Sequence, residues 1–132
     1  MNNACVCISI RKASRKLTAR YDADLAPAGI NLAQFSLLRN IRRHGPVSLT
    51  LLADIVDLDR STLGRNVRVL ERQGLVAIAA GKDQREATLT LTDNGKSTLE
   101  AAVPLWEGTQ RAIGTKLGAD GVAQLNALLS AL

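Results

Sequence analysis

The spacing of apolar residues changes at Gly74 from that of a helix to that of a strand. Before Gly74, apolar residues recur every three or four positions and predict a helix over 60–73 with one buried stripe. After it, threonine alternates with leucine along 88–91, which is typical of a strand with one buried face. The sequence therefore predicts a helix that ends at Gly74 and a β-hairpin that follows it directly, with strands over 75–80 and 86–91. The predicted helical stripe consists of Leu63, Val67 and Leu70.

Capping residues and prolines divide the rest of the chain into further helices. Asn31, followed three residues later by Gln34, has the spacing of a capping box and predicts a helix that stops at Gly45-Pro46. Ser48 predicts the start of a short helix just before the helix over 60–73. The remaining expected elements are a basic amphipathic helix over 7–26, a long helix over 93–117 capped by Thr92 or Asp93 and bent at Pro104, and a last helix over 120–132.

Composition limits the class of protein. A chain of 132 residues fits one domain. No apolar run approaches the roughly 18 residues of a membrane span, and Met1–Ala4 lacks the basic segment of a secretory signal, so we expect a cytoplasmic protein. Two cysteines are too few for a disulfide scaffold. With a single histidine, His44, and no paired-carboxylate or phosphate-loop motif, we expect neither an enzyme nor a cofactor.

Positive charge gathers in the middle of the chain. The net charge of +5 is a weak indication of a polyanionic partner. Residues 59–85 contain six basic residues against three acidic ones, whereas the last thirty residues are neutral. The low aromatic content of 2% argues against binding of RNA or single strands, which uses aromatic stacking. Double-stranded DNA fits this pattern better.

Two helices joined by a short turn and followed by a hairpin form a winged helix-turn-helix, whose second helix enters the major groove. Arg65 suits a guanine edge and Asn66 an adenine edge, while Ser61 and Thr62 suit phosphates at the helix start. Arg85, at the hairpin tip, suits the minor groove. Singly, such residues are more often solvated or capping residues; together they favour DNA binding. The full set of candidate DNA contacts is Ser48, Arg60, Ser61, Thr62, Arg65, Asn66, Arg68, Lys82, Asp83 and Arg85.

Residues 30–96 resemble the multiple-antibiotic-resistance regulator (MarR) family of bacterial repressors. The most specific matches are the hairpin tip Asp83-Gln84-Arg85 and the exit Leu91-Thr92-Asp93-Asn94-Gly95, and the flanking helices fit in order and length. The resemblance implies a homodimer on a pseudo-palindromic operator, with Asp83 orienting Arg85. Leu51 departs from the family, in which many members have a polar residue there. The last helix is also short, which implies a reduced dimer interface.

The resemblance divides the chain into a DNA-binding lobe over 30–92 and dimerisation helices over 1–29 and 93–132. Apolar stripes on the two last helices agree with it, since a monomer of this size has difficulty covering both. The alternative is that both helices fold back on their own lobe. The stripes consist of Leu99, Ala102, Val103, Leu105 and Trp106, and of Val122, Leu125, Leu128, Leu129 and Leu132.

Cys5 and Cys7 leave several interpretations open. In the first interpretation, they are small apolar residues buried in the core. In the second, they form a thiol switch, in which nearby Arg11 and Lys12 favour oxidation and a disulfide links two protomers. They can also hold a thiophilic metal or metalloid with four thiolates, two from each protomer. Alternatively, the cysteines have no role in regulation, and the signal that releases the repressor from DNA is a small aromatic acid or phenol bound between the dimer helices and the lobe, as is common in the family.

For the whole protein, the alternative to a DNA-binding repressor is a winged-helix interaction module that has lost DNA binding.

Overall fold

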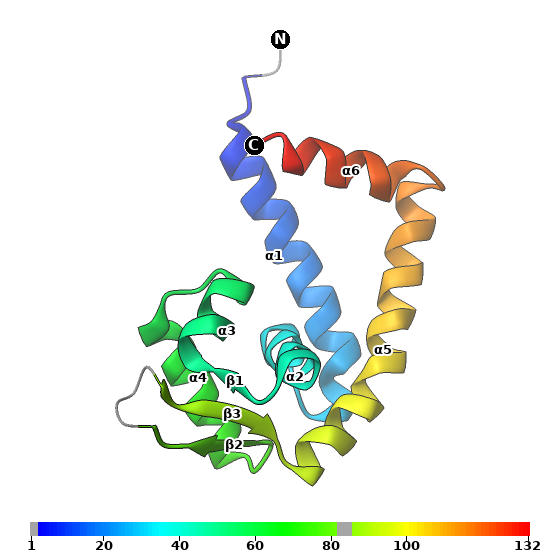
Figure 1. Ribbon diagram of the computed structural model, residues 1–132. Helices are drawn as coiled ribbons and strands as arrows, with labels where there is room; N and C mark the ends of the chain where they lie inside the picture. Colours follow the sequence, from blue (N-terminus) through cyan, green and yellow to red (C-terminus); the bar gives the residue numbers. More distant parts are fainter. Residues whose placement is uncertain (1–2, 82–85) are drawn as a thin grey trace.

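The computed structural model describes residues 3–81 and 86–132 of the chain. It is mainly helical with a small antiparallel sheet, as predicted (Figure 1). The helices that precede the sheet are α1 (Val6–Leu25), the short 3-10 helix η1 (Ala26–Ala28), α2 (Leu32–His44), α3 (Leu49–Val56) and α4 (Arg60–Arg72). The strands are β1 (Val47–Ser48), β2 (Val76–Ala79) and β3 (Thr88–Leu91), and the last two helices are α5 (Asp93–Leu117) and α6 (Gly121–Ser130).

The predicted helix starts are confirmed by side-chain caps. Asn31 and Gln34 form the expected capping box of α2, and the Ser48 hydroxyl accepts a hydrogen bond from the Leu51 amide at the start of α3. Thr92, and not Asp93, caps α5: its Oγ1 accepts from the Gly95 amide at 3.0 Å and donates to the Gly74 carbonyl at 2.6 Å. Gly74 has a φ of 76° and follows α4, so the predicted helix end is also confirmed.

The sheet has three strands in the order β1-β3-β2, where the sequence predicted only a hairpin. Val47 pairs with Leu89, and Val76 pairs with Leu91, both in antiparallel register. A two-residue strand is too short to show alternation in a sequence, which explains why β1 was not predicted. The two hairpin strands are also shorter than the predicted 75–80 and 86–91.

The buried stripe of α4 is the predicted one, with Leu63, Val67 and Leu70 at 0%, 1% and 0% exposed. It packs into a single core with α2, α3, the sheet and the first half of α5. Gly95 lies so close to the Leu75 backbone that a Cβ atom there would collide with its carbonyl oxygen. The start of α5 is therefore held against the base of the β2–β3 pair.

The two stripes assigned to dimerisation have different outcomes. Leu99 and Ala102 of α5 are buried in the core of their own lobe, so the expectation that they face a partner is wrong. The reason is that α5 begins at the sheet and runs along the lobe before leaving it (Figure 1). By contrast, α6 has no buried residue, and α1 is exposed as far as Arg20. Among the described residues, no helix has both the length and the apolar character needed to cross a bilayer.

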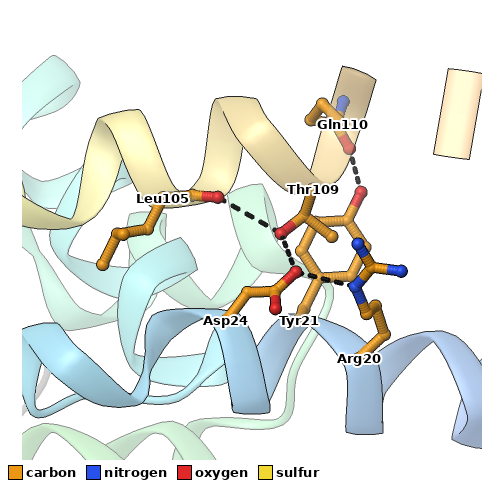
Figure 2. A network of polar contacts seen from close by, with 6 residues as sticks. All are labelled: Arg20, Tyr21, Asp24, Leu105, Thr109 and Gln110. Atoms are coloured by element: carbon orange, nitrogen blue, oxygen red, sulfur yellow. Dashed lines mark hydrogen bonds and ion pairs between the residues drawn. The ribbon is translucent and has the colours of Figure 1, made fainter. Parts of the chain in front are cut away.

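A polar network joins the second half of α1 to α5 (Figure 2). Thr109, only 1% exposed, has its Oγ1 2.7 Å from Asp24 Oδ2, and Arg20 donates through Nε to the same oxygen at 2.8 Å. The Tyr21 hydroxyl donates to Gln110 Oε1. The hydrogen bonds from Thr109 and Arg20 lower the pKa of Asp24, and desolvation raises the pKa of Tyr21. These contacts fix α1 against α5 beyond the lobe.

Candidate nucleic-acid interface

The outer face of α4 carries most of the predicted DNA contacts that the structure describes. Because Leu63, Val67 and Leu70 face the core, the opposite side of the helix points outward. Arg60, Arg65 and Arg68 are exposed there, as is Ser61, while Thr62 and Asn66 are half-buried. The structure therefore brings Arg60, Ser61, Arg65 and Arg68 together along one groove. Asn66 does not share this face, because it lines a separate pocket between α4 and the α2 residues Gln34 and Leu37.

A cationic groove runs between α4, the start of α3 and the β2–β3 pair. Its volume is about 400 Å³. Arg60, Arg65 and Arg68 line it from α4, and Gly64 between them has no atom within 4 Å of where a Cβ would lie. No acidic residue is among the described residues that line it, so this part of the groove suits an anionic ligand. The rest of the lining consists of Leu49, Ser61, Ile78 and Ala87.

Asp59 organises the first turn of α4, although it is not among the candidate residues predicted from the sequence. Its Oδ1 accepts from the Thr62 amide at 2.8 Å and from the Ser61 hydroxyl at 2.7 Å, and its Oδ2 accepts from the Thr62 hydroxyl at 2.8 Å. The Thr62 amide, then these two hydroxyls, hold the pKa of Asp59 far below its usual range. An aspartate directly before a helix start is a typical N-cap, and that signal was sufficient to find it.

Ser48 lies apart from this cluster, where β1 meets α3. Its hydroxyl oxygen accepts from the Leu51 amide at 3.1 Å. The turn between α3 and α4 is made by Asp57, whose φ of 55° is left-handed, a conformation that aspartate tolerates better than most residues. This turn sets how α3 and α4 follow one another. Leu51, the departure from the family pattern, is exposed on α3.

The predicted contacts at the hairpin tip, Lys82, Asp83 and Arg85, lie outside the described residues. Cys5 and Cys7 are described: Cys5 is the N-cap residue of α1, Cys7 lies in its first turn, and both are exposed. The interpretation that they are buried is therefore wrong for the single chain, because this end of α1 extends beyond the lobe. Within 3–81 and 86–132, no group of three or more His, Cys, Asp or Glu side chains is placed to hold a metal.

A smaller pocket of about 200 Å³ lies between α2 and α5. The Arg39 guanidinium stands 4.7 Å from the centre of the Trp106 ring, and Phe35 stacks on that ring with centroids 5.5 Å apart. Arg43 also lines the pocket. Two cations and an aromatic surface suit a small aromatic anion, which is one of the alternatives that the sequence leaves open.

The chain is similar in sequence and structure to known transcriptional regulators. A sequence model of the MarR family matches residues 28–86. The MosR transcriptional regulator of M. tuberculosis, solved in complex with DNA, is 35% identical over 97% of this chain and 98% of its own, with a TM-score of 0.79. A MarR variant from E. coli complexed with operator DNA is 26% identical over 95% of this chain and 91% of its own, with a TM-score of 0.86.

Curated relatives are transcriptional regulators as well. The organic hydroperoxide resistance transcriptional regulator of Bacillus subtilis is 27% identical over 96% of this chain and 86% of its own length. The transcriptional repressor NicR of Pseudomonas putida is 29% identical over 72% of this chain, but the matched part is 61% of its length. The part of the uncharacterized regulator YwoH of Bacillus subtilis that matches this chain is 66% of the length of YwoH.

Proposed function

Since the chain belongs to the MarR family of DNA-binding transcriptional regulators, we propose that it is a homodimeric repressor that binds a pseudo-palindromic DNA operator. The observation that carries this proposal is the groove beside α4, which is lined by Arg60, Arg65 and Arg68 and by no acidic residue among those that the structure describes. Arginine side chains on a major-groove helix bind guanine edges and phosphates. The proposed role as a repressor is supported by the relative NicR, which is named a transcriptional repressor.

Dimerisation is supported by the apolar side chains that the single chain leaves exposed at one end. Leu128 is 70% exposed on α6, and Ile8 is 48% exposed on α1. Large exposed apolar surfaces of this kind are typical of protein interfaces. We assign dimerisation to residues 1–29, the second half of α5 and α6, and DNA binding to residues 30–92. The other exposed large apolar residues of this end are Val6, Ile10, Leu17, Leu117, Val122, Leu125, Leu129 and Leu132.

The experiment is a binding titration with the DNA that flanks the chain's own gene, at several salt concentrations. We expect affinity to fall steeply with salt, since several phosphates are neutralised. Arg65→Ala and Arg85→Ala should weaken binding and leave the dimer intact in sedimentation. Lys96→Ala, which removes an equal charge from the exposed side of the first turn of α5, outside both assigned regions, is the matched control. Salt-independent affinity, or equal effects of all three variants, would contradict the proposal and favour an interaction module.

We propose release from DNA through thiol oxidation as one signal. Both cysteines are exposed at the end of α1, and a relative is named for resistance to organic hydroperoxides. One thiol from each protomer would lose its proton and one electron to a hydroperoxide, which becomes an alcohol and water, while the two sulfurs form a disulfide. A change at this end would alter the angle between the two lobes.

A small aromatic acid in the Arg39–Trp106 pocket is the second candidate signal, supported by that pocket's two cations and aromatic wall. The two signals separate in one experiment. Cys5→Ser and Cys7→Ser should abolish release by an organic hydroperoxide and leave release by salicylate unchanged. Arg39→Ala should do the reverse. Metal-dependent release that requires both cysteines would instead support the thiophilic-metal alternative.

A further inference from the structure

The three hydroxyl groups predicted to contact DNA differ in the direction of their hydrogen bonds. Ser48 accepts from the Leu51 amide, so its proton is not used in that bond. Ser61 and Thr62 instead donate to Asp59, at 2.7 and 2.8 Å. A hydroxyl has a single proton and two lone pairs, so these bonds decide what each group has left for a ligand.

The direction of the bonds at Asp59 is fixed by its charge. With its pKa far below the usual range, Asp59 is ionised at neutral pH and has no proton to donate. Both hydroxyls must therefore point their protons at it. If either hydroxyl turned its proton toward DNA, a carboxylate oxygen of Asp59 would lose one hydrogen-bond donor in an interface that excludes water, and this loss costs free energy.

Ser61 and Thr62 therefore face a ligand as acceptors. Phosphate oxygens are also acceptors, and the negative charge of Asp59 repels them in addition. This argues against the expectation that these two residues bind phosphates at the start of α4. Ser48, which keeps its proton, is suited to a phosphate.

Of the two residues, Ser61 is the one that keeps both lone pairs open toward the described part of the chain. Thr62 Oγ1 is half-buried and already accepts from Arg65 Nη2 at 3.3 Å, which orients that guanidinium. Ser61 is exposed and lines the groove beside Arg65. Given the DNA-binding role proposed above, we infer that Ser61 accepts a hydrogen bond from the exocyclic amino group of adenine or cytosine in the major groove, with Asp59 as its positioning residue.

The inference makes Ser61 a specificity-determining residue. In the major groove, adenine N6 and cytosine N4 are donors, whereas thymine O4 and guanine O6 and N7 are acceptors. A hydroxyl that can only accept gains a hydrogen bond from adenine or cytosine, whereas its lone pairs are repelled by the acceptor atoms of thymine or guanine. For one hydrogen bond, we expect a preference of about 3- to 10-fold at one base of each half-site.

The experiment selects duplexes from a random-sequence library with the full chain and three variants: Ser61→Ala, Asp59→Gly and Asp57→Gly. Asp59→Gly removes the acceptor, and glycine is tolerated at a helix N-cap. Asp57→Gly is the matched control, because it removes the same charge from the same turn. Glycine adopts the φ of 55° there without strain, and within the described residues the structure gives the Asp57 side chain no hydrogen bond.

We expect the DNA motifs selected by the wild type and by Asp57→Gly to share one position at which adenine or cytosine is preferred. The motifs selected by Ser61→Ala and Asp59→Gly should lose the preference at this position and keep the preferences at the others. Asp59→Gly should also bind unrelated duplexes more tightly than Asp57→Gly does, because its freed hydroxyls can donate to phosphates. Replacing the preferred base by purine or 2-pyrimidinone, which lack the amino group, should weaken the wild type about 3- to 10-fold and leave Ser61→Ala unchanged.

Three results would overturn the inference. The first is a Ser61→Ala variant that binds every duplex more weakly by one factor, as expected for a phosphate contact. The second is an Asp59→Gly variant with the same base preferences as Asp57→Gly. Both leave the proposed DNA-binding function standing. Failure of the wild type to select any motif would instead overturn that function and the inference together.

Discussion

Asp24 and Asp59 make similar contacts in two distant regions of the molecule. Each is a carboxylate that accepts from a threonine hydroxyl and lies near an arginine, and each has a lowered pKa. The partners of Asp59 are two and three residues away on one helix start. The main partner of Asp24, Thr109, is 85 residues away on another helix. The same chemistry thus orients a surface in one region and joins two helices in the other.

The largest effect we expect comes from acidification, which acts on both carboxylates. Both have a lower pKa in the folded chain than in the unfolded chain, so their stabilisation is complete above the unfolded pKa of about 3.9 and is lost as pH falls through the folded pKa. Asp59, with the stronger shift, should retain its contribution to lower pH than Asp24. Melting temperatures of the wild type, Asp24→Asn and Asp59→Asn at pH 6, 4 and 3 test this.

In those data, the difference between the wild type and Asp24→Asn should shrink below about pH 4. A difference that stays constant down to pH 3 would mean that Asp24 is not stabilised as a carboxylate by Thr109 and Arg20.

A matched threonine substitution separates the two roles. Thr109→Val, at a buried site, should lower the free energy of unfolding by about 1–2 kcal/mol, since Asp24 loses its nearest donor while side-chain shape is kept. Thr62→Val should cost clearly less stability and instead weaken DNA binding, because Arg65 loses its contact to the hydroxyl. Chemical denaturation and DNA titration of both variants measure this. Equal stability losses would remove the distinction between the regions.

Tyr21→Phe tests whether the α1–α5 contact extends beyond Asp24. The variant leaves Gln110 without its tyrosine partner, and we expect a loss of about 0.5–1.5 kcal/mol in the free energy of unfolding. In the double variant with Thr109→Val, the losses should be non-additive, since both bonds join the same two helices. Strict additivity would show that the two bonds act independently.

Arg20→Ala should have the smallest effect. The ion pair with Asp24 is exposed and spans four residues of one helix, and such pairs contribute about 0.3–0.5 kcal/mol. The loss should decrease further at high salt. A loss as large as that of Thr109→Val would mean that the arginine, and not the threonine, is the main partner of Asp24.

The contrast between the two aspartates also explains what the sequence could predict. The caps Asn31, Ser48 and Thr92 act on residues within one helical turn, so local spacing is sufficient to find them. The stripe of α4 follows from helical periodicity, which gives the outer face and its arginines as well. The Asp24–Thr109 contact depends on how two helices cross, and no local pattern reports that.

Periodicity identifies an apolar face but not what covers it. Leu99 and Leu128 belong to similar stripes in the sequence, yet the first is buried in its own lobe and the second is exposed. In the same way, the sequence placed Ser61 and Thr62 outside the buried stripe of α4, but it did not give the direction of their hydrogen bonds. That direction depends on Asp59, whose side chain occupies the donors of the helix start.

The Thr92 hydroxyl links two helices through one atom. It donates to Gly74, just past the end of α4, and accepts from Gly95, in the first turn of α5. The Thr92 amide in turn donates to Leu75, at the base of β2. No loop lies between these bonds to absorb a change of angle. We therefore expect the end of α4 and the start of α5 to turn together as one rigid unit, so that a swing of the far end of α5 would rotate α4, the helix proposed to face DNA.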